Sequence, residues 1–239
     1  MSELSCTPTL DGLLSYEAAV DQLVGAAKPI VERQTVGLRE ALGRVIAESL
    51  VSSIDVPGWD YSAMDGYAVR ASDCAVSGTQ LPISQRLPAG VSPLPLEAGT
   101  AARIFTGAPI PSGADAVVMQ EVCTESGDGV RIDAVVQPGG NIRRRGEDIS
   151  AGSGLIDPGT RLLPQHLGLA ASVGVVALEV CRRPRVALFA SGDELLMPGE
   201  ALAPGKIYNS NLLIATGLLQ ALGCDVVELG IVQDSLEAT

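Results

Sequence analysis

The chain has 239 residues, of which 46% are hydrophobic and 18% charged, a balance typical of a folded protein of two or more domains. Its 16 basic and 28 acidic residues give a formal net charge of -12, which disfavours binding to nucleic acid. Five cysteines stand far apart and in no paired motif, so we expect reduced thiols and a cytoplasmic protein. The longest uncharged apolar stretch is too short to cross a bilayer, and the start lacks a signal-peptide pattern, so no membrane contact is expected.

Two segments near the start carry apolar residues at helical spacing. In residues 15–28 the pattern follows Ser15, a good N-cap residue, and Pro29 ends it. Residues 37–50 repeat the spacing with Leu38, Leu42 and other apolar side chains. The sequence therefore predicts two amphipathic helices.

From Val56 onward the pattern changes to short apolar runs separated by turns rich in Gly and Pro. This texture is typical of a small β domain. Turn residues at 138–140 end it, just before the basic run at 143–145. The expected strands include residues 101–105, 116–119, 129–132 and 134–136.

The rest of the chain predicts a helix around residues 163–173, followed by a strand, a helix and a second strand. These last three elements are residues 185–190, 212–222 with Asn209 or Ser210 as N-cap, and 225–232. The order predicts two parallel strands with a right-handed crossover. Two strands and one helix cannot cover both faces of a sheet, so we expect the beginning of a larger domain in a C-terminally truncated chain.

These patterns predict an α/β and β multidomain protein. Residues 1–54 with 141–180 would form a helical linker domain, and residues 55–140 a small β domain inserted in it. Residues 181–239 would form the first part of a parallel α/β domain.

Acidic residues follow both strands predicted for the last segment. The loop from Ser191 to Glu194 follows the first strand, and Asp234 follows the second. Ligands bind at the carboxyl ends of strands in open α/β sheets, and a divalent cation relieves repulsion between carboxylates there. The functional interpretation is a Mg²⁺ site; spacing alone rather favours acids that face water or cap the next helix.

Three other features could carry chemistry. The arginines at 143–145 could clamp an oxyanion, or they could pair with the acids at 147 and 148. Thr106 offers a hydroxyl in a Gly/Pro loop, a pattern shared with plain turns. His166 lies in an apolar stretch that favours packing over catalysis, and as the single histidine it leaves little support for Ser-His-Asp chemistry.

Four stretches resemble the molybdopterin molybdenumtransferase (molybdenum insertase) family, which includes the C-terminal domain of gephyrin. They are residues 55–68 with Ser62-Ala-Met-Asp-Gly66, residues 105–121 with Thr106-Gly-Ala-Pro109, residues 141–149, and Ser191-Gly-Asp-Glu-Leu195. The resemblance implies the last step of molybdenum cofactor biosynthesis, in which molybdate is inserted into adenylyl-molybdopterin with Mg²⁺ and AMP is released. It also implies an elongated homodimer, in which the small β domain of one subunit faces the molybdopterin-binding α/β domain of the other. A contact with the molybdopterin adenylyltransferase is a further implied partner.

The resemblance also assigns site residues. It implies catalytic residues at Asp65, Thr106, Glu194 and Asp234, the last two also as metal ligands. It implies substrate-binding positions at Ser62, Arg143, Asp148, Gly192 and Asp193. Asp65 would be held out on a rigid loop, with Trp59 and Tyr67 as anchors of that loop.

Two questions about activity stay open on the sequence alone. The family's remaining substrate loops and final β domain lie beyond Thr239, so we expect this chain to lack full activity. The alternative to an enzyme is a non-enzymatic assembly scaffold of the gephyrin type. The acids at 65, 194 and 234 favour the enzyme, because a scaffold could dispense with them.

Overall fold

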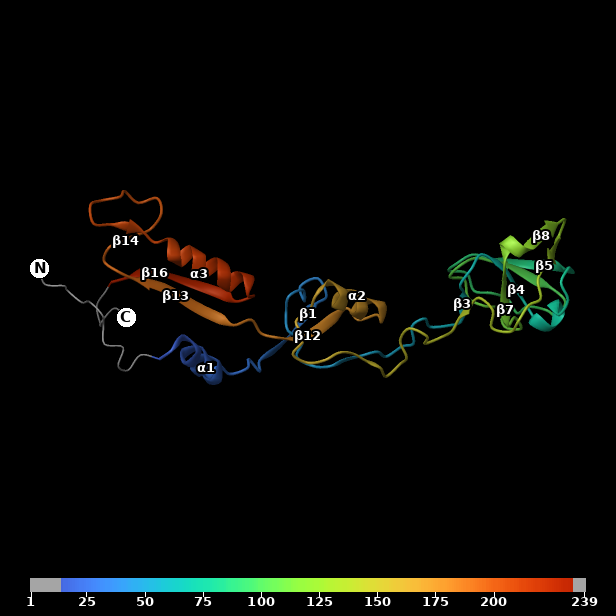
Figure 1. Cartoon of the computed structure of the whole chain (residues 1–239), viewed down its shortest axis with the longest axis horizontal. Coiled ribbons are helices and arrows are strands. Elements are labelled where there is room, and N and C mark those ends of the chain that lie inside the picture. Colours follow the sequence, from blue (N-terminus) through green and yellow to red (C-terminus); the bar gives the residue numbers. More distant parts are fainter. Residues whose placement is uncertain (1–13, 234–239) are drawn as a thin grey trace, which may run out of the picture. The chain divides into compact units, whose positions relative to one another are not determined.

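The computed structural model describes residues 14–233 (Figure 1). The chain divides into two compact units, one made of residues up to 34 together with those from 181 onward, the other of residues 35–180. None of the helices in the described range has the length and hydrophobicity needed to span a membrane. The structure is mixed α/β, and the division into three domains stays a prediction.

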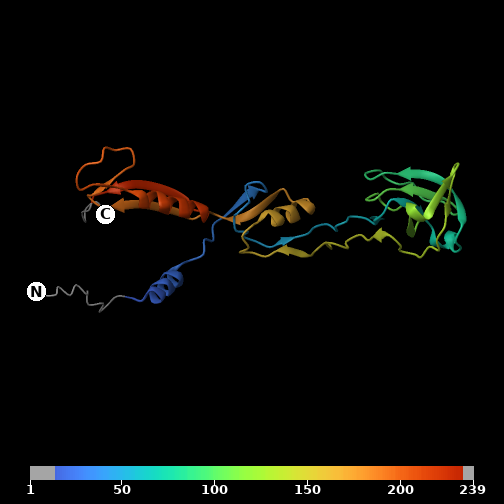
Figure 2. The same cartoon turned by 45° about the horizontal axis from the view of Figure 1, so that its top comes forward.

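The first unit contains the predicted strand–helix–strand segment. Strand β13 (Arg185–Ser191) pairs in parallel with β16 (Asp225–Val232), and α3 (Ser210–Ala221) connects them and lies alongside both (Figures 1 and 2). Asn209 is the N-cap of α3 and accepts a bond from the amide of Leu212 at 3.1 Å. The strand–helix–strand order, the parallel pairing and the Asn209 cap are confirmed. The short strands β14 (Leu195–Leu196) and β15 (Ile207–Tyr208) pair within the connection.

Helix α1 (Tyr16–Ala26) also matches its prediction. The side chain of Ser15 accepts a bond from the amide of Ala18 at 3.1 Å, as expected of an N-cap. None of the residues of α1 is buried by the described chain, and Leu23 is 73% exposed.

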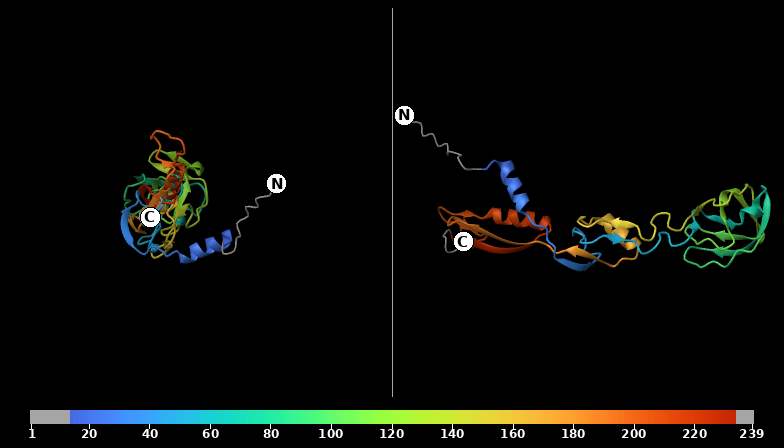
Figure 3. Two further views of the ribbon diagram at one scale, coloured as in Figure 1. Left: turned by 90° about the vertical axis from the view of Figure 1, so that its left-hand side faces the viewer. Right: turned by 90° about the horizontal axis from the view of Figure 1, so that it is seen from below.

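The second unit carries a curled six-stranded sheet (Figures 2 and 3). The strand order is β7-β4-β6-β5-β9-β8, with β5 and β6 parallel and every other neighbouring pair antiparallel. Successive residues of β4 face opposite sides, so Tyr67 joins one buried cluster and Ala68 another. The strands are β4 (Gly66–Val69), β5 (Thr79–Leu87), β6 (Ala101–Ile104), β7 (Ala116–Met119), β8 (Cys123–Ser126) and β9 (Gly129–Ile132).

Short elements surround a third buried cluster in the same unit. Ile46, Leu162 and Val180 are among its members, each at most 1% exposed. Antiparallel pairs join β2 to β11 and β3 to β10, while β1 pairs with β12. The elements are β1 (Arg33–Gly37), β2 (Leu50–Val51), β3 (Tyr61–Ser62), β10 (Ile142–Arg143), β11 (Gly154–Ile156), α2 (Pro164–Ser172) and β12 (Ala177–Cys181). Two 3₁₀ turns, η1 (Ala71–Cys74) and η2 (Gln120–Val122), lie beside the six-stranded sheet.

The helix predicted for residues 37–50 is wrong. This segment runs as turns and single bridges. Its first turn has one helical bond, from the Ala41 amide to the Gly37 carbonyl at 3.1 Å, but several later amides bond to distant carbonyls and the helix does not continue. The amide of Ile46 donates to the carbonyl of Thr160 at 3.0 Å, and that of Gly43 to Leu162 at 2.8 Å. Gly43 has φ +74°, a left-handed conformation that ends any helix at that point. Residues 134–136 are likewise not a strand, although Val136 packs on the sheet.

Candidate functional site

The structure brings together two of the predicted catalytic residues, Asp65 and Thr106. Asp65 lies in the turn between β3 and β4, and Thr106 follows β6. The Oδ1 atom of Asp65 accepts a bond from the Thr106 amide at 2.8 Å and another from its hydroxyl Oγ1 at 2.8 Å. Within residues 14–233 no bond to Oδ2 of Asp65 occurs. One carboxylate oxygen is therefore fixed, and the other remains available to a ligand.

These two bonds set the charge of Asp65. The Thr106 amide, then the Thr106 hydroxyl, lower the pKa of the Asp65 carboxyl below its ordinary value, and Arg103 contributes a smaller effect in the same direction. Asp65 is consequently ionised at neutral pH and is a weak base. A group of this kind is suited to orienting a ligand by hydrogen bonds or by charge.

Backbone constraints fix the turn that presents Asp65. Ser62 is fully buried; its hydroxyl donates to the Met64 carbonyl at 2.6 Å and lies 3.3 Å from the Met64 amide. A Cβ on Gly66 would stand 1.8 Å from the Val118 carbonyl oxygen, so only glycine fits there. The bonds of Ser62 and the close approach of the Val118 carbonyl to Gly66 explain why these two residues flank Asp65, whereas a substrate contact of Ser62 stays a prediction.

Arg103 bonds to residues of neighbouring elements next to Asp65, a role that was not predicted from the sequence. Its guanidinium donates to the Gly66 carbonyl at 2.9 Å through Nη1 and to Oε1 of Gln120 at 2.6 Å through Nη2. The Gln120 amide in turn donates to the Asp65 carbonyl at 3.0 Å. The sequence does contain an indication of this role, because Arg103 interrupts the apolar run at 101–105. A charged side chain in a buried strand is tolerated only where other polar groups bond to it.

Arg103 also lies over two aromatic rings. Its guanidinium carbon is 5.2 Å from the centroid of Tyr67 and 4.5 Å from that of Phe105. Tyr67 is buried and donates its hydroxyl to Glu125, and burial is the main reason why its pKa rises to about 12. Tyr67 thus anchors the loop as expected, whereas Trp59 is 60% exposed and is no buried anchor.

The arginines at 143–145 pair with carboxylates of their own unit. Arg143 bonds Asp148 at 2.5 Å, and Arg145 bonds Asp55 at 2.6 Å. Arg144 bonds Asp60 at 2.6 Å. The pairs of Arg144 and Arg145 join the loop before β3 to the loop after β10, whereas the pair of Arg143 and Asp148 lies within β10 and the loop that follows it. The structure therefore gives the arginines and Asp148 a local role. Binding of substrate by Arg143 and Asp148 stays a prediction.

Three further predicted residues, Gly192, Asp193 and Glu194, belong to the other unit, in the loop after β13. Glu194 and Asp193 are exposed, and the Glu194 carboxylate folds back over Gly192, where an added Cβ would lie 2.7 Å from it. Asp234 lies outside the described residues. The parallel register, Ser191 opposite Val232, places the carboxyl ends of both strands at one edge of the sheet, as expected.

The described residues form no complete metal site. Glu194 has the oxygen donors that Mg²⁺ prefers, and within residues 14–233 no ion pair occupies its carboxylate. No group of three or more His, Cys, Asp or Glu side chains in that range could hold a metal ion. Glu194 therefore fits a ligand role in its chemistry, but these residues form no complete site.

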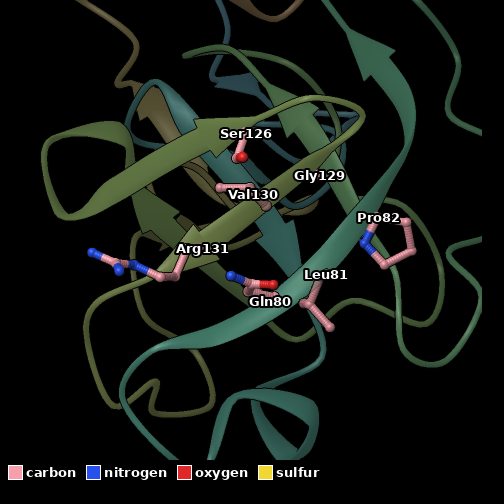
Figure 4. Close-up of a pocket in the computed structure, with 7 residues that line it drawn as sticks. All are labelled: Gln80, Leu81, Pro82, Ser126, Gly129, Val130 and Arg131. Atoms are coloured by element: carbon pink, nitrogen blue, oxygen red, sulfur yellow. The ribbon is translucent and has the colours of Figure 1, made fainter.

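Two other features have no place in the predicted site. The ring nitrogen Nδ1 of His166 accepts a bond from the Leu163 amide at 3.0 Å at the start of α2, which is a structural role. A hollow of about 260 Å³ lies over β5, β8 and β9, with Gln80 and Arg131 as polar lining (Figure 4). No predicted site residue lines it, and Arg131 is paired with Asp133.

Comparison with known families gives one match over most of the chain. Residues 14–174 match the model of the "MoeA N-terminal region (domain I and II)". This range contains Ser62, Asp65 and Thr106, and it ends before Glu194.

Two curated relatives and one solved structure support the same match. The molybdopterin molybdenumtransferase of Haemophilus influenzae is 41% identical over 226 residues, 93% of this chain and 55% of the relative. Molybdopterin molybdenumtransferase 2 of Mycobacterium tuberculosis is 40% identical over 217 residues, 89% of this chain and 53% of the relative. The molybdopterin biosynthesis moeA protein of Pyrococcus horikoshii OT3 has a TM-score of 0.86 at 33% identity, covering 94% of this chain and 61% of that one. The chain spans about half the length of the curated relatives it matches.

Proposed function

This chain belongs to the MoeA family, matching its N-terminal region of domains I and II, and on that basis we propose that it acts in molybdenum insertion. In this proposal molybdate is inserted into adenylyl-molybdopterin, AMP is released, and the product is the molybdenum cofactor. The activity is that of a molybdopterin molybdenumtransferase, as the names of the relatives say.

The observation that carries the proposal is the bonded pair of Asp65 and Thr106. The two residues are 41 positions apart, and the carboxylate accepts both polar hydrogens that Thr106 offers. A surface carboxylate that only solubilises a protein needs no such support. A fixed carboxylate with one open oxygen matches a group that positions a reactant.

We assign positioning rather than proton abstraction to Asp65. Release of AMP requires that the oxygen of water bonds to phosphorus while the bridging P–O bond of the pyrophosphate link breaks. Because its pKa is lowered, Asp65 is a poor general base at neutral pH. Its open oxygen would accept a hydrogen bond from the attacking water and so orient it, while Thr106 keeps the carboxylate still.

The other predicted residues belong to the same proposal. Glu194, together with Asp234, would hold Mg²⁺, which supplies charge neutralisation at phosphate when it is bound. Arg143, Asp148, Gly192 and Asp193 would contact substrate. Arg143 already pairs with Asp148 at 2.5 Å and with Glu147 at 3.1 Å, so a phosphate would compete with these two carboxylates for its guanidinium.

We also propose a homodimer, with α1 as part of its interface. Leu23 and Val24 of α1 are 73% and 69% exposed, and Tyr16 is 80% exposed. Burial of such side chains against a second copy would remove apolar surface from water. Contact with the molybdopterin adenylyltransferase, the enzyme that makes the adenylylated substrate, is part of this proposal.

Release of AMP tests the proposed function. The purified chain is mixed with adenylyl-molybdopterin, molybdate and Mg²⁺, and AMP is measured over time. We expect release above the uncatalysed rate, and a loss of roughly 100-fold or more in Asp65→Asn, which keeps the shape but removes the charge. Asp73→Asn is the matched control because Asp73 lies in η1 and has no part in the proposed site. No release by the chain, or undiminished release by Asp65→Asn, would overturn the proposal.

A further inference from the structure

Trp59, the single tryptophan of the chain, is exposed although the backbone around it is fixed. Its side chain is 60% exposed. The neighbouring Asp60 accepts bonds from the Arg145 amide at 2.8 Å and from Arg144 at 2.6 Å, and its carbonyl accepts from the Ile110 amide at 3.0 Å. A rigid loop that presents an open aromatic face is typical of a binding surface, because a ligand covers apolar area without having to order the loop.

Trp59 forms one wall of a hollow of about 300 Å³. The other walls are the loop after β5 and the loop after β6, lined by Gly90, Val91, Ser92, Pro93, Gly107 and Pro109. This volume is at the small end of the range for small-molecule sites, about 300–1,000 Å³. Side-chain bonds hold the first loop: the amide group of Gln85 donates to the Leu94 carbonyl at 2.9 Å and accepts from the Leu94 amide at 3.1 Å.

The hollow adjoins the pair of Asp65 and Thr106. Gly107, in its lining, directly follows Thr106, and its amide donates to the Ser62 carbonyl at 2.9 Å. The amide of Ser62 donates to the Ala108 carbonyl at 2.9 Å, so the Trp59 loop and the Thr106 loop are bonded side by side. The hollow therefore lies beside the loop that carries Thr106, the bonding partner of Asp65.

The residues that line the hollow indicate which kind of ligand it would bind. None of its residues is charged, which disfavours a phosphate or molybdate at this position. Two glycines in the lining present peptide surface without side chains, and Ser92 offers a hydroxyl. Uncovered peptide surface, an aromatic face and hydrogen-bonding groups suit a planar heterocycle.

We propose that Trp59 and this hollow bind a fused nitrogen heterocycle by stacking. The identity of the ring rests on the proposed function, since the proposed substrate carries two such rings, pterin and adenine. The hollow binds one of these, and the phosphates extend from it toward Asp65 and Thr106.

A single tryptophan makes the test direct, because the protein has one indole N–H signal in a proton–nitrogen correlation spectrum. Adenosine and free pterin are titrated separately into the chain. We expect the indole signal to shift and to saturate with one of the two rings. We also expect Trp59→Ala to weaken binding of that ring, measured by calorimetry, by roughly five- to 100-fold, and Trp59→Phe to retain most of it. Val76→Ala is the control, since Val76 is 71% exposed in the same unit and does not line the hollow.

The outcomes separate this inference from the proposed function. A saturating shift with adenosine assigns the hollow to adenine, and one with pterin assigns it to the pterin. No shift with either ring, or unchanged affinity in Trp59→Ala, overturns the inference even if AMP release depends on Asp65. If a ring binds Trp59 while AMP release fails, the proposed function falls and the ring site stands.

Discussion

Replacement of Arg103 by methionine tests whether this arginine holds the site together. Its side chain is 13% exposed and donates three bonds, to the Gly66 carbonyl, the Ile104 carbonyl and Gln120, at 2.9, 3.2 and 2.6 Å. A hydrogen bond to a charged group contributes about 1.5–3 kcal/mol, but bonds of one network do not add, and Met recovers some packing. We expect Arg103→Met to lower the free energy of unfolding by about 3 kcal/mol, within the range for breaking a buried charged network.

Thermal and denaturant unfolding measure this loss. In a chain of this size 1 kcal/mol corresponds to roughly 2–4 °C in Tm, so we expect a decrease of about 6–12 °C. Arg131→Met is the matched control on strand β9, where the side chain is 49% exposed and pairs with Asp133. An exposed pair contributes about 0–1 kcal/mol, so the control should move Tm by about 4 °C at most. Equal losses in the two variants would refute the role given to Arg103.

Two further predictions concern the same sheet. Gly66→Ala places a Cβ 1.8 Å from the Val118 carbonyl oxygen. We expect it to lower the free energy of unfolding, measured with denaturant, by about 3 kcal/mol or more. Unchanged stability would show that β4 and β7 can move apart without cost. The pKa of Tyr67, raised to about 12, means that its contribution to stability is complete below pH about 10 and is lost as pH rises to about 12. Unfolding of Tyr67→Phe should lack this alkaline loss relative to wild type, and an identical pH profile would contradict it.

Local patterns were sufficient to predict the elements with clear ends. Ser15 and Asn209 both cap their helices through the side chain, and Pro29 and Gly223 follow the helix ends. Strands β13 and β16 could be predicted as parallel because a helix connects them. In each case the information lies within a few residues of the element.

The segment at 37–50 could not be predicted locally, because its partners are far away in the chain. Its apolar residues recur at helical spacing, yet Val45 and Ile46 form single bridges with Arg161 and Val180. Tertiary pairing overrides a helical pattern when distant backbone groups satisfy the amides. Gly43 was the local sign against a helix.

The resemblance predicted the residues of the candidate site, but it did not predict the bonds that hold them in place. Asp65 and Thr106 were named from their motifs, and the structure adds the bonds that join them. Arg103 was missed because its partners lie on other strands, which no spacing in the sequence reveals. Trp59 was expected to anchor the loop, but the bonds at Asp60 hold the loop and the indole is exposed.

Titration of Asp65, followed through its side-chain carboxyl carbon by NMR, shows directly whether the carboxylate is bonded to Thr106 in solution. We predict a midpoint below the ordinary aspartate value of about 3.9. Thr106→Val should raise this midpoint but leave it below the ordinary value, because the amide of residue 106, the largest cause of the lowering, is kept. An ordinary midpoint in the wild type that Thr106→Val does not change would show that the pair is not formed in solution, and the proposed site would lose its basis.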